Sequence, residues 1–156
     1  MPVEPDAFRA ALGRFPSGVT VVTLDDGAGG VHGITVSSFV SLSLIPPLVG
    51  VAIGRKARAH RMIGAPRFGV SVLAADQAQV SDHFAARPVA LPAEPFEDLE
   101  GHPLIRGAVA HLVCTIVDRV ETGDHTLLVG RVDASRVTEG APLAYHGGRY
   151  GRVLAD

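Results

Sequence analysis

Apolar and hydroxyl residues alternate along the stretch from Ile34 to Leu44. One parity carries Ile34, Val36, Val40, Leu42 and Leu44, interrupted by Ser38, and the other carries Thr35, Ser37, Ser41 and Ser43, interrupted by Phe39. Because successive side chains of a strand point to opposite faces, this pattern predicts one extended strand with an apolar face and a hydroxyl face. Such a strand is either half-buried with a solvated side, or a polar surface for a flat, hydrogen-bonding ligand.

The rest of the chain is patterned as short elements joined by turns. Helices are expected over residues 5–14, 57–65 and 76–85, the last with Asp76 as its N-cap. Strands are expected over 17–24, 48–54 and 67–74, in two long runs on either side of a turn at 121–125, and in a C-terminal hairpin with a Gly-Gly turn. Residues 87–103, which include four prolines, are predicted to form only a loop.

Six or seven strands, joined mostly as hairpins, favour an all-β antiparallel barrel with a few short helices. The length of 156 residues suits a single domain over residues 1–156. No repeat or linker divides the chain.

Composition gives no indication of a nucleic-acid or membrane partner, and it bears on the expected cellular location. The net charge is only −2, which gives no general attraction to nucleic acid or to an anionic membrane. No apolar run is long enough to cross a bilayer, and the N-terminus has no apolar signal region. The single cysteine, Cys114, excludes an intrachain disulfide, so we expect a reducing cytoplasmic location.

Basic residues gather in one segment, "GRKARAHR", which holds Arg55, Lys56, Arg58 and Arg61. Such a cluster is either a solvated helix face or an anion site at the start of a helix. The residues alone leave both interpretations open.

Several common chemistries lack their motifs. The turn "GAGGVHG" places His32 where a dinucleotide-binding fingerprint needs its last glycine, and the seven histidines show no metal-ligand spacing. Cys114 lies in an apolar run, which favours an inert buried thiol. His125 follows Asp124 at a tight turn, where it either holds its own backbone or donates to a bound ligand.

Six motifs in order give the chain its resemblance to a known family. They are "FPSGVTVVT", "HGITVSSFVSLSLIPPLV", "FGVSVLAADQAQVSDHFA", "GHPLIRGAVAHLVC", "TGDHTLLVGRV" and "APLAYHGGRY". Together they resemble the short-chain flavin reductase family, the reductase components of two-component flavin monooxygenases, from about Phe8 to Val153. The resemblance implies a six-stranded antiparallel Greek-key split barrel, a homodimer, and flavin bound near the subunit interface.

The resemblance also implies roles for particular residues. The segment matching Gly33, Ile34, Thr35, Val36, Ser37 and Ser38 would run along the flavin ring, with Ser41 and Ser43 behind it. The family often has hydroxyl residues at the positions of Ala57 and Ala59, so Arg55, Lys56 and Arg58 are expected to bind the flavin phosphate instead. His125 would orient the nicotinamide or the flavin, Phe84 would wall the pocket, and Tyr145 and Tyr150 would line the nicotinamide side.

The leading functional hypothesis is therefore an NAD(P)H:flavin oxidoreductase. It would take NADH or NADPH and FMN or FAD, and would supply reduced flavin to a partner monooxygenase. The alternatives are a split-barrel flavoprotein that keeps its flavin and reduces another acceptor, and a non-catalytic flavin-binding barrel. The choice between FMN and FAD stays open because of Ala57 and Ala59.

Overall fold

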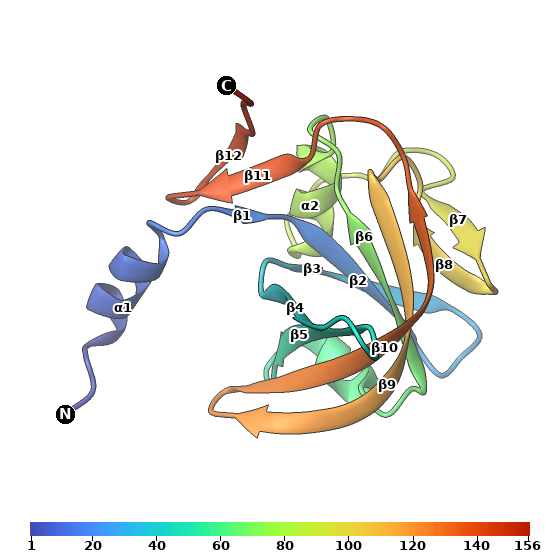
Figure 1. Cartoon of the computed structure of the whole chain (residues 1–156), viewed down its shortest axis with the longest axis horizontal. Coiled ribbons are helices and arrows are strands. Elements are labelled where there is room, and N and C mark those ends of the chain that lie inside the picture. The colour runs from blue at the N-terminus through green and yellow to red at the C-terminus, as the bar shows by residue number, and fades with distance from the viewer.

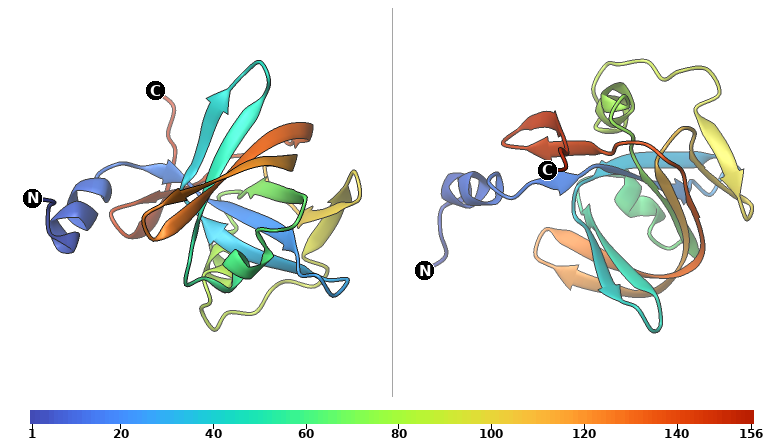
Figure 2. Two further views of the ribbon diagram at one scale, coloured as in Figure 1. Left: turned by 90° about the horizontal axis from the view of Figure 1, so that it is seen from below. Right: turned by 45° about the horizontal axis from the view of Figure 1, so that its top comes forward.

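A seven-stranded sheet forms the body of the molecule, and the structure, a computed structural model, describes all 156 residues. Its strands pair in the order β3-β2-β6-β9-β10-β5-β4, and every pair is antiparallel. They span Thr20–Asp25 (β2), Val31–Val36 (β3), Phe39–Ser43 (β4), Leu48–Gly54 (β5), Arg67–Val72 (β6), Ala110–Thr122 (β9) and His125–Val137 (β10). The sheet curls around its own core (Figures 1 and 2). The predicted all-β class is confirmed. The large sheet has seven strands rather than six, because the stretch predicted as one strand forms both β3 and β4.

The stretch from Ile34 to Leu44 is not one strand, which corrects the first prediction. β3 ends at Val36, β4 begins at Phe39, and the two strands form opposite edges of the sheet. At the break, the Ser38 hydroxyl donates to the Ala52 carbonyl oxygen of β5. The alternation is interrupted at the same place, by Ser38 on the apolar parity and by Phe39 on the hydroxyl parity.

The longest strands, β9 and β10, form the predicted hairpin around Gly123 and Asp124. Within β10, Gly130 lies directly against the ring of Phe68 from β6: a Cβ at this glycine would come within 2.5 Å of Phe68 Cζ. The glycine thus allows Phe68, which is fully buried, to fill the centre of the barrel.

Two apolar clusters occupy the two sides of the sheet. The larger cluster includes Phe68, Ile53 and Cys114, and the smaller one includes Leu73 and Ile105. The burial of Cys114 expected from the sequence is confirmed, and this burial raises the pKa of the thiol to about 12.

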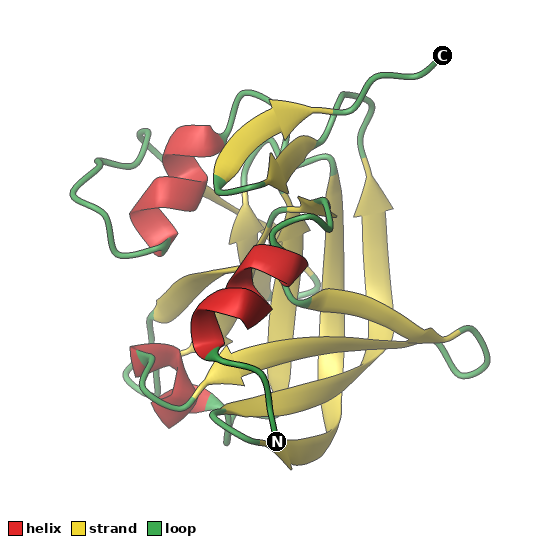
Figure 3. Ribbon diagram, turned by 90° about the vertical axis from the view of Figure 1, so that its left-hand side faces the viewer, coloured by secondary structure: helices red, strands yellow, loops and turns green.

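The helices are short and lie on the outside of the strands (Figure 3). They are α1 (Pro5–Leu12), the 3₁₀ helix η1 (Arg58–Met62) and α2 (Ala78–Phe84). α1 stands away from the barrel and buries none of its residues (Figure 1). The predicted cap of α2 is wrong: the N-cap is Gln77 rather than Asp76, and the Gln77 side chain instead accepts a hydrogen bond from the Ala74 amide.

None of these helices is long and apolar enough to cross a membrane.

Residues 87–103 are not only a loop, which corrects a second prediction. Strands β7 (Phe96–Leu99) and β8 (His102–Ile105) form a separate two-stranded hairpin. Pro103 is tolerated in β8 because that strand has a partner on one side only. A third small sheet joins β1 (Ser17–Gly18) to the predicted C-terminal hairpin of β11 (Leu143–His146) and β12 (Arg149–Arg152).

Candidate functional site

A cavity of about 830 Å³ opens beside β3 at one edge of the large sheet. Its walls come from β3, from the turn into η1, from the end of α2 and from the loop leading into β7. The lining residues are Val31, His32, Gly33, Ile34, Thr35, Lys56, Ala57, Arg58, His83, Phe84, Ala85, Ala86, Leu91 and Phe96. The size and the mixture of apolar walls with a few polar groups are typical of a small-molecule site.

Six of the predicted site residues meet in this cavity: Gly33, Ile34, Thr35, Lys56, Arg58 and Phe84. The Phe84 ring rests on the backbone of Gly33, where a Cβ would lie 2.6 Å from two of its ring carbons. Thr35 holds β3 against α2, since its hydroxyl donates to the Ser81 carbonyl oxygen at 2.6 Å. This hydroxyl therefore already has a partner within the protein.

The remaining predicted ligand-binding residues lie outside this cavity: Val36, Ser37, Ser38, Ser41, Ser43, Arg55, His125, Tyr145 and Tyr150. Val36 belongs to the buried core, and Arg55 lies 3.5 Å from the Glu121 carboxylate. Ser37, Ser38 and Ser41 are exposed, and Ser43 is half-buried. Because β3 and β4 are opposite sheet edges, the hydroxyls do not form the single row that alternation predicted.

Tyr150 fastens the C-terminal hairpin to α2. Its hydroxyl donates to Asp82 Oδ1 at 2.6 Å and lies 2.9 Å from Ser81 Oγ. Desolvation, and then the Asp82 carboxylate, raise the pKa of this phenol. Tyr145 packs edge-on to Tyr150, with ring centroids 5.6 Å apart. The pair thus supports the helix that carries Phe84.

His125 lies at the turn between β9 and β10, next to the segment that enters η1. Its Nδ1 is 2.7 Å from Asp124 Oδ1, and its side chain is 46% exposed. The hydrogen bond from His125 lowers the pKa of Asp124. The Arg55 amide donates to the Asp124 carbonyl oxygen at 2.9 Å, which fixes this turn to the residue directly before Lys56. Whether His125 contacts a nicotinamide stays a prediction.

Positive charge collects at one end of the cavity. Lys56 and Arg58 both line it, and neither forms a salt bridge. His32 lies near them, and desolvation followed by the charge of Arg58 lowers the pKa of its imidazole. Asp26 is the nearby acid, and amide donors at the β2–β3 turn lower the pKa of its carboxyl. This end of the cavity suits an anionic group.

Sequence reasoning missed several lining residues, among them His32, His83, Leu91 and Phe96. His32 directly precedes the predicted segment at Gly33, so its position offered a signal. Leu91 and Phe96 lie in the region that was predicted to be an unstructured loop. Of the two positions where the resemblance expected hydroxyls, Ala57 lines the cavity and Ala59 is fully buried.

Comparison with known proteins identifies the family. Residues 12–154 match the sequence profile of the "Flavin reductase like domain". The chain belongs to the flavin reductase family. The resemblance found in the sequence motifs is thereby confirmed, and the matched residues cover every strand of the seven-stranded sheet.

Relatives within the flavin reductase family align over nearly the full chain. An "NADH-dependent flavin reductase" of Rhodococcus sp is 43% identical over 151 residues, covering 95% of this chain and 86% of the relative. An "NADH-dependent FAD reductase" of Streptomyces globisporus is 40% identical over 164 residues, covering 99% of this chain and 89% of the relative.

Solved structures of flavin reductases share the fold. Flavin reductase PheA2 superposes with a TM-score of 0.91 at 39% identity, covering 98% of this chain and 100% of that one. The Streptomyces globisporus NADH:FAD oxidoreductase SgcE6, in complex with NAD and FAD fragments, superposes with a TM-score of 0.89 at 38% identity, covering 100% and 98%. The expected flavin reductase-like architecture is therefore confirmed.

Proposed function

We propose that this chain is an NADH-dependent flavin reductase that binds FMN or FAD in the cavity beside β3. The observation that carries the proposal is the meeting of Gly33, Thr35, Lys56, Arg58 and Phe84 around one cavity in a member of the flavin reductase family. Relatives named as NADH-dependent reductases of flavin and of FAD support the choice of substrates.

The residues at the charged end of the cavity fit a flavin phosphate. Lys56 and Arg58 have no carboxylate partner that a phosphate would have to displace. Each charge-assisted hydrogen bond to a phosphate oxygen contributes about 1.5–3 kcal/mol. Two such bonds supply a large part of the ~8 kcal/mol of a micromolar complex. The two basic side chains thus replace the phosphate-binding hydroxyl groups that Ala57 and Ala59 lack.

The rest of the cavity would hold and shield the ring system. When bound there, the flavin would supply an N5 atom that can take a hydride from a reduced nicotinamide. Phe84, Leu91 and Phe96 supply apolar surface that excludes water, and the absence of a side chain at Gly33 lets the Phe84 ring lie against β3. His125, outside the cavity but tied to the same turn as Lys56, would orient the nicotinamide. A hydride transfer needs no acid or base of its own, which agrees with the few titratable groups in the cavity.

A micromolar flavin site suits an enzyme that hands its product to another protein. We propose a flavin-dependent monooxygenase as that recipient, because relatives are named as reductase components of 4-nitrophenol and 4-hydroxyphenylacetate monooxygenases. The test is anaerobic stopped-flow mixing of NADH with the protein and either FMN or FAD. Bleaching of the flavin at a rate that saturates with free flavin is expected, and no bleaching with either flavin would refute the function.

A second copy of the chain is proposed to cover the apolar surface near β4. Leu44 is 84% exposed and Ile45 is 89% exposed, directly after this edge strand. Val40 and Leu42, on β4 itself, are also exposed. Such a contiguous apolar surface on a sheet edge is typical of a protein–protein interface. We therefore propose the homodimer that the resemblance implies.

A further inference from the structure

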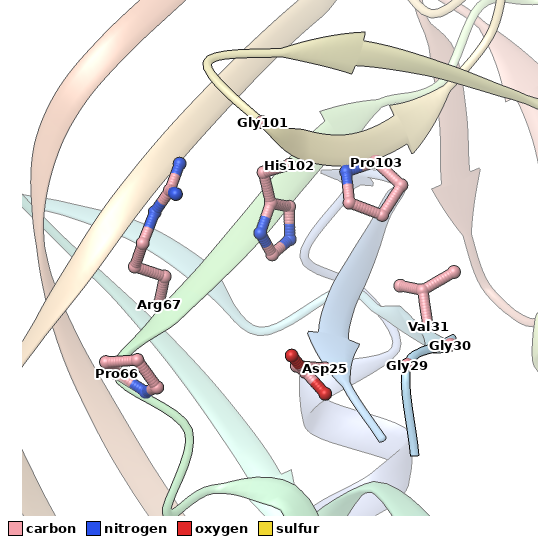
Figure 4. A pocket seen from close by; sticks show the side chains of 9 residues that line it. All are labelled: Asp25, Gly29, Gly30, Val31, Pro66, Arg67, Gly101, His102 and Pro103. Carbon is pink, nitrogen blue, oxygen red and sulfur yellow. The ribbon is translucent and has the colours of Figure 1, made fainter. Parts of the chain in front are cut away.

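A second cavity, of about 470 Å³, lies between the tips of two hairpins (Figure 4). The β2–β3 turn forms one wall, the β7–β8 turn forms another, and the start of β6 closes the base. Its lining residues are Asp25, Gly29, Gly30, Val31, Pro66, Arg67, Gly101, His102 and Pro103. Val31 also lines the cavity beside β3, so the two cavities adjoin at this residue.

His102 presents a hydrogen-bond acceptor to this cavity. The residue is only 6% exposed, and its Nε2 donates to the Thr23 carbonyl oxygen at 3.0 Å. The proton is therefore on Nε2, and Nδ1 is left with a lone pair and no partner in the protein. Desolvation lowers the pKa of this imidazole, which keeps it neutral near neutral pH. Figure 4 shows the ring at the centre of the cavity, between Arg67 and Pro103.

The cavity also holds two opposite charges that the protein does not pair. Arg67 donates through Nη2 to the Glu100 carbonyl oxygen at 2.9 Å, and its other donors form no hydrogen bond within the protein. Asp25 accepts the Gly27 amide with Oδ1 at 2.7 Å and keeps its second oxygen free. Neither residue takes part in a salt bridge.

We propose that this second cavity binds the adenosine half of a dinucleotide whose reactive half lies in the cavity beside β3. The inference rests on the proposed function, because a flavin reductase handles two dinucleotides of this kind, FAD and NADH. The volume lies within the usual range for a small-molecule site, about 300–1,000 Å³.

The chemistry of adenosine matches the groups in the cavity one by one. The exocyclic amine of adenine donates to an acceptor such as His102 Nδ1. A carboxylate such as Asp25 accepts from ribose hydroxyls, as acidic residues do in other dinucleotide sites. The purine ring stacks on a guanidinium plane such as that of Arg67, and the rings of Pro66 and Pro103 add apolar surface. Gly29 and Gly30 have no side chain that would obstruct the approach along β3.

The test uses two substitutions that spare the core. Asp25→Asn keeps the oxygen that accepts the Gly27 amide and removes the charge, and Arg67→Met removes the guanidinium. Asp26→Asn is the matched control, because Asp26 caps the same turn but does not line this cavity. Since Asp26 lies near Arg58, this variant is judged by the ratio of the FAD and FMN constants, which it should leave unchanged. For each protein we would measure the Kd of FAD and of FMN, and the KM of NADH and of reduced nicotinamide mononucleotide.

Each arm compares a ligand that carries adenosine with one that lacks it. If the adenosine of FAD binds here, both substitutions raise the Kd of FAD about tenfold and leave that of FMN unchanged. If the adenosine of NADH binds here, the same selective rise appears in the KM of NADH but not in that of the mononucleotide. Unchanged ratios in both arms would overturn the inference. Continued reduction of FMN by the mononucleotide would show that the reductase function stands independently.

Discussion

The contact between Gly33 and Phe84 offers the sharpest test of the cavity beside β3. In Gly33→Ala, the new Cβ would lie 2.6 Å from Phe84 Cδ1 and Cε1, closer than carbon atoms approach in proteins. The Phe84 ring must therefore move, and this ring forms part of the cavity wall. We expect the substitution to reduce both stability and flavin affinity.

The size of the effect follows from two opposing contributions. Alanine is favoured over glycine in a strand interior by roughly 0.5–1 kcal/mol, because it loses less backbone entropy on folding. Overpacking costs about 1–3 kcal/mol. We therefore expect a net loss of up to about 2.5 kcal/mol, or a Tm lower by up to about 10 °C for a domain of this length.

Gly54→Ala is the matched control for this experiment. Gly54 also lies in a strand, β5, and the atom nearest to its added Cβ is His125 Nε2 at 3.7 Å, an ordinary contact. Thermal unfolding and flavin titration should show a loss for Gly33→Ala but not for Gly54→Ala, and Gly33→Ala should cost less in a Phe84→Ala background, where the clash is absent, than in the unaltered chain. Equal behaviour of the two glycine variants would refute the proposed role of the Gly33–Phe84 contact.

Four further outcomes are expected. Lys56→Ala combined with Arg58→Ala should raise the Kd of FMN about tenfold or more in a fluorescence titration, and an unchanged Kd would place the phosphate elsewhere. His125→Ala should slow NADH-driven reduction in stopped flow more than it weakens flavin binding, and an equal loss of both would contradict its orienting role. The pKa of His32 is lowered in the folded protein, so as the pH falls the unfolded chain protonates this imidazole before the folded chain does. The stability of the folded protein should therefore fall as the pH drops below the ordinary histidine pKa of 6.5. His32→Gln should make the decline of Tm with pH less steep. Leu44→Glu should shift the sedimentation profile from dimer to monomer, whereas an unchanged profile would exclude this surface as the interface.

Much of the fold could be predicted because hairpin signals are local. The turn around Gly123 and the Gly147–Gly148 turn both lie where the sequence placed them, between strands of the expected kind. The break between β3 and β4 was harder to predict, because the interruption of the alternation at Ser38 and Phe39 does not by itself indicate that two strands part there. Only the pairing of β3 with β2 and of β4 with β5 separates them, and such long-range pairing has no local signature.

The candidate site was predictable where its residues follow one another in the chain. Gly33 to Thr35 and Lys56 to Arg58 are short consecutive segments, so a motif could locate them. Phe96 is the first residue of β7 and Leu91 lies in the loop before it, in a region whose four prolines predict no strand. Tyr150 is predicted to line the nicotinamide side, but its hydroxyl donates to Asp82, which lies 68 residues earlier in the sequence. Only the folded chain brings these two residues together.

Because Cys114 is buried, its thiol should not react with thiol reagents while the protein is folded. A thiol with a pKa of about 12 is almost entirely protonated at neutral pH, and a maleimide reacts with the thiolate. A single cysteine introduced on the surface would therefore be the one labelled position in the native state. Modification of Cys114 itself would report only molecules whose barrel has opened, so the rate of its labelling measures how often the core is exposed.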